Sequence, residues 1–194
     1  LHAYTDLPAD YDVEDQKLFD LVAPYTMVPR ERIYTLARSV EYILQHNIPG
    51  DFVECGTWKG GCSMAIAHTL QRLGVHDRMI TMFDLFGDPW PQCSDVDIVR
   101  GTHVDELLKD FTDEQHQSMI YTVEEVEFAL SQTGFPKSQM QFIKGDIMKT
   151  VPQQAPEQIA LLRLDTDFYE STRHEFEHLY PRRSCKVVSV KGSW

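Results

Sequence analysis

The sequence is short of basic residues and of long apolar runs. Its 194 residues include 18 Lys and Arg against 30 Asp and Glu, which gives a formal net charge of −12. A protein that binds a nucleic-acid duplex needs a positive surface to neutralise phosphates, so nucleic acid is not an expected partner. The apolar runs are all far shorter than the ~18–20 residues of a membrane-spanning helix, so no membrane partner is expected either.

Cysteines with paired spacing are also missing. The four are Cys55, Cys62, Cys93 and Cys185, and they form no Cys-x-x-Cys pair. Reduced thiols are therefore predicted rather than a disulfide framework. Cys62 begins a predicted helix, where a reactive thiol is the less favoured interpretation. No basic segment followed by an apolar one stands near Leu1, so a cytoplasmic location is expected.

The negative charge is concentrated in one part of the chain. Between Asp84 and Glu127 there are 12 acids and two bases, Arg100 and Lys109. Solvated helix faces and loops explain such a stretch more readily than an acidic surface that attracts a cationic partner.

What remains is the composition of an ordinary globular domain, with 42% hydrophobic and 25% charged residues. Apolar residues at helical spacing between Glu31 and Gln45 predict a helix, and Pro49-Gly50 ends it. Further patterns predict strands at 51–55, 78–83, 140–143, 159–164 and 186–190, and helices at 62–73, 122–132 and 169–180. Residues 1–28 are predicted as an extended arm with at most one short helix, and 84–121 as irregular. Alternating strands and helices predict an α/β fold with a mostly parallel sheet.

A glycine-rich segment follows the first predicted strand. Phe52-Val-Glu-Cys-Gly-Thr-Trp-Lys-Gly-Gly61 places an acid at a strand end, then glycines, then a helix. Glycines there let a ligand approach the backbone, and a helix N-terminus supplies N–H groups. About 30 residues on, Asp84 ends the second strand, where a carboxylate can accept hydrogen bonds from ribose hydroxyls. The segment departs from G-x-G-x-x-G, which argues against a dinucleotide pyrophosphate.

A second group of polar residues follows the most apolar strand. In Leu161-Leu-Arg-Leu-Asp-Thr-Asp-Phe-Tyr-Glu-Ser-Thr172, Asp165 and Asp167 share one face if the chain stays extended. Two such carboxylates can bind Mg²⁺, or one can bind the metal while the other acts as general base. An acid-rich helix start explains the same letters, and the local pattern does not choose between the two.

Taken together, these strings, with Phe83-Asp84 and Lys144-Gly-Asp146, resemble the macrocin O-methyltransferase (TylF-type) family from about Thr26 to Arg182. The resemblance implies a Rossmann-like class I methyltransferase fold and an enzyme that uses S-adenosylmethionine and Mg²⁺ to methylate a hydroxyl of a sugar or glycosylated natural product. It also implies roles for individual residues. The cofactor would contact Glu54, Gly56, Gly60, Ser63, Asp84 and Asp146; Asp165 would bind Mg²⁺, Asp167 would be the catalytic base, and Thr26 and Arg32 would belong to a lid.

The resemblance further implies a division into an arm and lid helix at 1–50 and a cofactor-binding core at 51–194. The family pattern continues with a Gly-Gly turn, further strands and an Asp-Asp metal pair, whereas this sequence diverges after Arg182 and has no acid after Glu177. We therefore expect a sheet that lacks its final strands. A catalytically impaired cofactor-binding remnant is the alternative function, and a homo-oligomer that covers the open sheet edge is also compatible with the sequence.

One motif favours a different chemistry. His174-Glu-Phe-Glu-His178 matches H-E-x-x-H, the pattern of zinc peptidases. Such a site needs a third protein ligand, and no His, Asp or Glu follows His178. The zinc interpretation is therefore a remote alternative, and two surface histidines are the favoured one.

Overall fold

The structure is a computed structural model that describes residues 11–184 and 188–190. The helices are α1 (Val13–Val22), α2 (Arg30–Gln45), α3 (Gly61–Arg72), α4 (Val104–Lys109), α5 (Asp113–Gln117), α6 (Val123–Ser131), α7 (Ile147–Thr150) and α8 (Tyr169–His178). The strands are β1 (Asp51–Cys55), β2 (Ile80–Asp84), β3 (Ile98–Val99), β4 (Thr102–His103), β5 (Met140–Lys144), β6 (Ile159–Leu164) and β7 (Val188–Val190). Short 3₁₀ turns cover Ala23–Tyr25, Lys137–Gln139 and Tyr180–Arg182.

A five-stranded sheet with the order β5-β2-β1-β6-β7 forms the centre of the fold. Every pairing in it is parallel, which confirms the predicted α/β class and mostly parallel sheet. The C-terminal ends of all five strands therefore lie along one edge of the sheet, which we call the carboxyl edge. In open parallel sheets this is where ligands bind.

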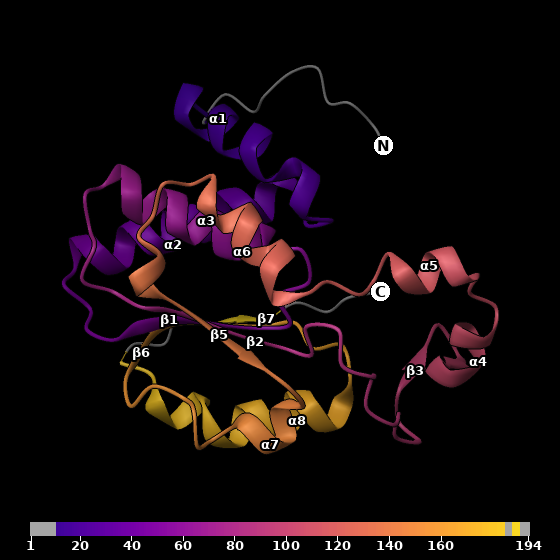
Figure 1. Cartoon of the computed structure of the whole chain (residues 1–194). Coiled ribbons are helices and arrows are strands. Elements are labelled where there is room, and N and C mark those ends of the chain that lie inside the picture. Colours follow the sequence, from indigo (N-terminus) through magenta and orange to yellow (C-terminus); the bar gives the residue numbers. More distant parts are fainter. Residues whose placement is uncertain (1–10, 185–187, 191–194) are drawn as a thin grey trace.

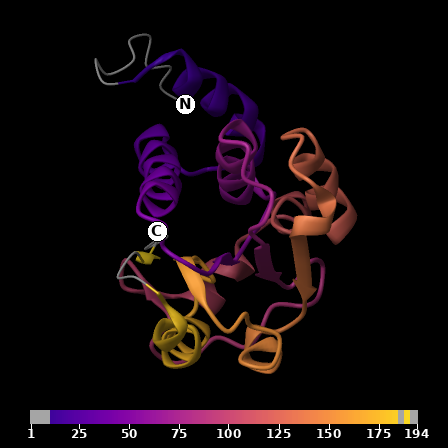
Figure 2. The same ribbon diagram turned by 90° about the vertical axis from the view of Figure 1, so that its left-hand side faces the viewer.

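Helices cover both faces of the sheet. In Figure 1, α1, α2, α3 and α6 lie above the sheet and α7 and α8 below it, and Figure 2 shows the same separation from the side. A hydrophobic cluster fills each interface. All six residues of β6 are buried, which explains its near-continuous apolar run.

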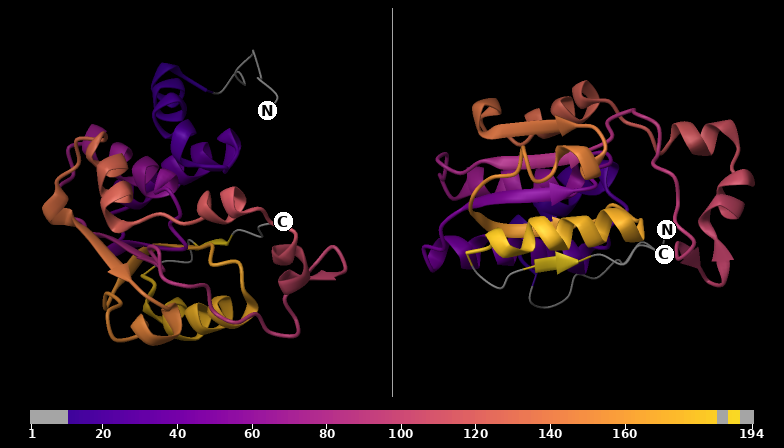
Figure 3. Two further views of the ribbon diagram at one scale, coloured as in Figure 1. Left: turned by 45° about the vertical axis from the view of Figure 1, so that its right-hand side comes forward. Right: turned by 90° about the horizontal axis from the view of Figure 1, so that it is seen from below.

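Residues 85–121 form an excursion that projects beyond the carboxyl edge. Figure 3 shows β3, β4, α4 and α5 beyond the end toward which the strand arrows point. The prediction of an irregular segment was wrong in part, because two short helices and a two-stranded antiparallel hairpin occur there. The helices have five and six residues, too few for the spacing of apolar residues to reveal them.

The described part of the N-terminal arm packs against the rest of the chain. Helix α1 begins with a capping box at Asp12 and buries Leu18, Phe19 and Val22, so residues 13–22 do not form an extended arm. The same hydrophobic cluster includes residues of α2, α3 and β1. Residues 1–10 lie outside the described residues, and the division of the chain at residue 50 stays a prediction.

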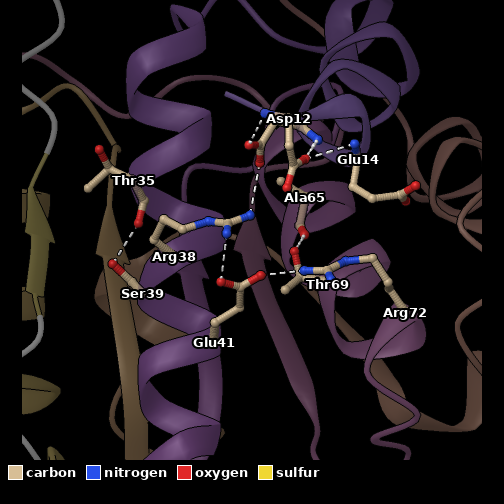
Figure 4. Close-up of polar contacts among 10 residues, drawn as sticks. Asp12, Glu14, Thr35, Arg38, Ser39, Glu41, Ala65, Thr69 and Arg72 are labelled. Carbon is tan, nitrogen blue, oxygen red and sulfur yellow. Dashed lines mark hydrogen bonds and ion pairs between the residues drawn. The ribbon is translucent and has the colours of Figure 1, made fainter. Parts of the chain in front are cut away.

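Charged side chains link three of the helices on this face, α1, α2 and α3. Arg38 of α2 contacts the buried Asp15 of α1 at 2.8 Å and Glu41 at 3.0 Å. Glu41 also accepts a hydrogen bond from Arg72 of α3, and Figure 4 shows this chain of contacts from helix to helix. The ion pairs supplement apolar packing that already holds α1 in place.

The last predicted strand is present as β7, which pairs in parallel with β6. The prediction covered 186–190, of which 188–190 are described. Cys185 lies outside the described residues. No helix in the described part of the chain is both long and apolar enough to cross a lipid bilayer.

Candidate functional site

The loop between β1 and α3, residues 56–60, contains glycines that the fold itself requires. Gly56 has a φ of +80°, and a Cβ at this position would collide with the backbone carbonyl of Asp165. Gly60 has a φ of +89°, and a Cβ there would come within 2.9 Å of Val126 and Leu130. Both glycines thus have a packing reason, since only Gly adopts this backbone region freely. Their predicted contacts with a cofactor stay predictions.

The loop is crossed by the segment that precedes α2. A Cβ on Gly61 would lie 2.5 Å from the carbonyl oxygen of Tyr25 and 2.6 Å from Cβ of Thr26. Thr26 is therefore held against the start of α3, and its role in a lid stays a prediction. Arg32, in the first turn of α2, is exposed.

A buried polar chain runs beneath the loop through Ser63, Glu54, Arg163 and Asp165. The Ser63 hydroxyl donates to one carboxylate oxygen of Glu54, and Nη1 of Arg163 donates to the other at 2.5 Å. Nη2 of Arg163 donates to Oδ2 of Asp165 at 2.6 Å. One guanidinium therefore joins the carboxylates at the ends of β1 and β6.

The electrostatics of this chain follow from burial. Burial raises the pKa of Glu54, and the Arg163 guanidinium opposes that rise. Burial lowers the pKa of Arg163, but the Glu54 carboxylate raises it above its ordinary value. We therefore assign Arg163 as charged.

Glu54 and Ser63 are predicted cofactor residues, yet both are fully buried and contact each other. Their side chains support the loop from beneath. The sequence analysis assigned no role to Arg163; its signal was a single charged residue within the apolar run 161–164.

Asp84, at the end of β2, anchors the same loop from the other side. Its Oδ2 accepts from the backbone N–H groups of Thr57 at 2.5 Å and Trp58 at 2.8 Å. Burial raises the pKa of Asp84, and these two amides oppose that rise. The hydroxyl of Thr57 is buried and has no hydrogen-bond partner among the described residues. It is an unpartnered polar group within the loop, and the sequence analysis assigned it no role.

Asp146 directly follows Gly145, a residue that contacts Asp84. The N–H of Gly145 donates to the carbonyl oxygen of Asp84 at 2.9 Å, so the ends of β2 and β5 are joined there. The Asp146 side chain accepts from the N–H of Met148 at 2.9 Å and caps α7, and Lys149 lies 3.6 Å from it. Both predicted cofactor acids therefore stand at the carboxyl edge, about 60 residues apart in the sequence.

Asp165 and Asp167 lie in the turn between β6 and α8. The N–H of Asp165 donates to the carbonyl oxygen of Cys55 at 2.8 Å, which continues the pairing with β1. Strand β6 ends at Leu164, and the exposed Asp167 has a φ of +69°. The chain is thus not extended here, so the premise that would place both carboxylates on one face fails. A non-glycine residue in this backbone region is uncommon and clusters at functional sites.

The H-E-x-x-H motif lies on α8. Glu175 is fully buried, and neither carboxylate oxygen has a hydrogen-bond partner of normal geometry among the described residues. Burial raises the pKa of Glu175 to about 8, the Thr166 hydroxyl lowers it, and Asp165 and Asp167 raise it. Nε2 of His174 lies 2.9 Å from the carbonyl oxygen of Val151.

Within residues 11–184 and 188–190, no group of three His, Cys, Asp or Glu side chains could hold a metal ion. The histidine pair thus has no third zinc ligand in this part of the chain. The thiol of Cys62 is also buried, and burial raises its pKa to about 12, so the favoured interpretation of an unreactive thiol is confirmed.

A family model described as Macrocin-O-methyltransferase (TylF) matches residues 14–187. A curated relative from Streptomyces olivaceus, 8-demethyl-8-(2,3-dimethoxy-alpha-L-rhamnosyl)-tetracenomycin-C 4'-O-methyltransferase, is 32% identical over 162 residues. That alignment covers 82% of this chain and 59% of the relative. Mycinamicin III 3''-O-methyltransferase from Micromonospora griseorubida is 29% identical over 160 residues, which is 82% of this chain and 61% of the relative.

Solved structures give the same result. The O-methyltransferase NovP superposes with a TM-score of 0.70 at 28% identity, over 82% of this chain and 63% of NovP. The chain therefore spans about three fifths of the length of the curated relatives that it matches.

Proposed function

This chain belongs to the macrocin O-methyltransferase (TylF) family, and we propose that it is the cofactor-binding part of an S-adenosylmethionine-dependent O-methyltransferase that acts on a hydroxyl of a glycosylated natural product. The observation that carries the proposal is the meeting of four segments at the carboxyl edge. These are the glycine-rich loop, Asp84, Asp146 and the turn with Asp165 and Asp167. They are distant in the sequence, but direct backbone and side-chain contacts join the loop to Asp84 and to Asp165, and Asp84 to Gly145.

The residues of this edge fit S-adenosylmethionine. The loop offers the unpartnered hydroxyl of Thr57. The Asp84 carboxylate accepts from three backbone N–H groups, those of Thr57, Trp58 and Phe86, and keeps a further lone pair for ribose hydroxyls. Asp146 would lie beside the adenine. Carboxylates suit a cofactor whose sulfonium is positive.

When bound, S-adenosylmethionine supplies a methyl group on a positive sulphur, and transfer to an oxygen is an in-line displacement. The protein's main task is then to hold donor and acceptor in line. We assign Asp167 to take the proton from the acceptor hydroxyl as the new bond forms. Its exposed side chain at the carboxyl edge suits that role.

The described residues do not by themselves fit a Mg²⁺ site. Oδ2 of Asp165, the proposed ligand, accepts from Arg163, and the described part of the chain holds no cluster of three candidate ligands. Mg²⁺ dependence and the role of Asp165 as a ligand stay predictions.

Two relatives suggest the acceptor. One is named for a substrate that carries a rhamnosyl group, and the other for mycinamicin III. A sugar hydroxyl on such a molecule is the acceptor that we propose. The catalytically impaired remnant and the homo-oligomer also stay open as alternatives.

Calorimetric titration with S-adenosylmethionine, with Mg²⁺ and then with EDTA, tests the cofactor assignment. We expect saturable binding near one per chain that does not depend on the metal, and no binding by folded protein would contradict the proposal. Methyl transfer is then measured with radiolabelled S-adenosylmethionine, using mycinamicin III and 8-demethyl-8-(2,3-dimethoxy-alpha-L-rhamnosyl)-tetracenomycin C as acceptors. Asp167→Asn should abolish transfer and leave cofactor affinity nearly unchanged. Binding without transfer by the wild type would favour the remnant.

A further inference from the structure

The start of α8 lacks a local cap. Its N-cap residue is Phe168, which has no side-chain group that can accept a hydrogen bond from the first turn. The first N–H groups of a helix need acceptors, and Ser, Thr, Asp or Asn usually supplies one from the N-cap position. This helix begins two residues after Asp167, so its cap bears directly on the geometry of the proposed base.

The missing acceptor comes from Asp97, which is 72 residues away in the sequence. Oδ1 of Asp97 accepts from the N–H of Tyr169, the first residue of α8, at 2.7 Å. Oδ2 accepts from the N–H of Ser94 at 2.6 Å and from its hydroxyl at 2.8 Å. All three contacts come from donors, so both oxygens must be acceptors. The side chain is buried, with 6% of Asp97 exposed.

Neighbouring backbone contacts hold Asp97 in the position from which it accepts from Tyr169. The N–H of Val104, at the start of α4, donates to the carbonyl oxygen of Asp97 at 2.9 Å. Nε2 of His103 lies 2.9 Å from the carbonyl oxygen of Ser94. Burial alone would raise the pKa of Asp97, but the N–H of Tyr169 and the contacts from Ser94 hold it below its ordinary value. The acid is therefore ionised at neutral pH.

A second contact joins the same two segments. The rings of Trp90 and Phe168 meet edge to face, with centroids 6.4 Å apart. The excursion thus contacts the β6–α8 turn through a charge-assisted hydrogen bond and an aromatic pair on adjacent residues of that turn. This places the excursion next to Asp167, at the edge where the acceptor must approach.

We infer that Asp97 is a positioning residue that fixes the Asp167 turn against the excursion, and that the excursion forms one wall of the acceptor site. The inference rests on the proposed function for the role of Asp167, while the link itself does not. Asp97 touches neither donor nor acceptor; it acts through the start of α8. Loss of the link should misplace the base and leave the cofactor loop, which Asp84 and Glu54 hold, unchanged.

Asp97→Asn tests the inference. One carboxylate oxygen becomes an N–H₂ group, which cannot accept a hydrogen bond and therefore breaks the contact with either Tyr169 or Ser94. The matched control is Asp95→Asn, the same change at an exposed residue of the same loop. Two readouts are used: hydrogen–deuterium exchange of residues 165–172, and kcat with the KM for S-adenosylmethionine in the assay above. We expect faster exchange and a kcat lower by roughly 100-fold at unchanged KM in Asp97→Asn only, since small misplacements have effects of this size.

Unchanged exchange and kcat in a folded Asp97→Asn protein would overturn the inference, as would an equal effect in Asp95→Asn. If Asp97→Asn does not fold, Ser94→Ala removes one contact to the same carboxylate and should give a smaller change of the same kind; no change would count against the inference. If the wild type transfers no methyl group, the proposed function is in question, and the exchange data alone decide whether Asp97 holds the turn.

Discussion

Two buried glutamates, Glu54 and Glu175, are stabilised in different ways. Glu54, at the end of β1, contacts Arg163 and Ser63 and belongs to a connected polar chain. Glu175, on α8, has no ion pair with any described residue and lies near the carboxylates of Asp165 and Asp167. A buried carboxylate needs a partner or must become neutral. The first glutamate thus stays an ion-pair partner, and the second is held as a neutral acid near pH 7.

Removing the Arg163 guanidinium should have the largest effect on the difference between Glu54 and Glu175. Arg163→Met removes the guanidinium that donates to both Glu54 and Asp165, and we expect the free energy of unfolding to fall by about 3–5 kcal/mol. Urea denaturation measures it. The exposed Arg173→Met on α8 is the control and should change nothing measurable. Adding Glu54→Gln to Arg163→Met should recover part of the loss; a loss below about 1 kcal/mol for Arg163→Met would contradict the assignment.

The other side of the comparison is tested by pH. Because the pKa of Glu175 is about 8 in the fold and near 4.5 in the unfolded chain, the folded protein binds one more proton between these values. Its contribution to stability therefore falls as pH rises from about 4.5 to 8, by at most ~1.4 kcal/mol per pH unit, and is then constant.

Glu175→Gln should remove this slope and stabilise the protein at pH 8 by a few kcal/mol or less, as measured by urea denaturation at several pH values. Glu177→Gln, half-exposed on the same helix, is the control. Identical pH profiles for Glu175→Gln and the wild type would show that Glu175 is not neutral in the fold.

Asp84 shows a third arrangement, in which backbone amides replace the arginine. Asp84→Asn weakens the hold on Thr57 and Trp58 and removes a charge from the proposed ribose site. We expect affinity for S-adenosylmethionine to fall by roughly 1–3 kcal/mol, with Asp84→Ala at the upper end. Calorimetry measures the affinity, with Asp88→Asn as the control. Asp88 lies in the segment that follows β2, and its side chain is 45% exposed. Unchanged affinity would remove Asp84 from the cofactor site.

The smallest effect is expected far from the carboxyl edge. Asp15 is buried, but it is stabilised by the start of α1 and by Arg38, which is partly exposed. Asp15→Asn should cost about 1 kcal/mol of unfolding free energy, the usual value of a helix-cap contact. Thermal melting at low and high salt measures it, with the exposed Asp20→Asn as control. A loss as large as that of Arg163→Met would mean that burial alone sets the cost.

Much of the fold follows from local patterns. The continuous apolar run 159–164 and the glycines after 51–55 predicted two central strands and the loop between sheet and helix, and the structure confirms them. The polar residues Asp84 and Asp165 directly follow two of the predicted apolar strands. The prediction for residues 1–28 allowed one short helix, and α1 lies there, but its position was not predicted. The helices of the excursion were missed, because short helices with few apolar residues give no clear period.

By itself, the sequence therefore determined the succession of the main strands and helices along the chain, the family, and the acids that follow the strands. The tertiary structure decided how each acid is used. Arg163 joins Glu54 to Asp165, and Asp97 caps a helix 72 residues away. Glu175 is buried with no ion pair to the part of the chain that the structure describes. The physical reason is that a carboxylate's state depends on the donors and charges within a few ångström, and in a parallel sheet those neighbours come from distant parts of the chain.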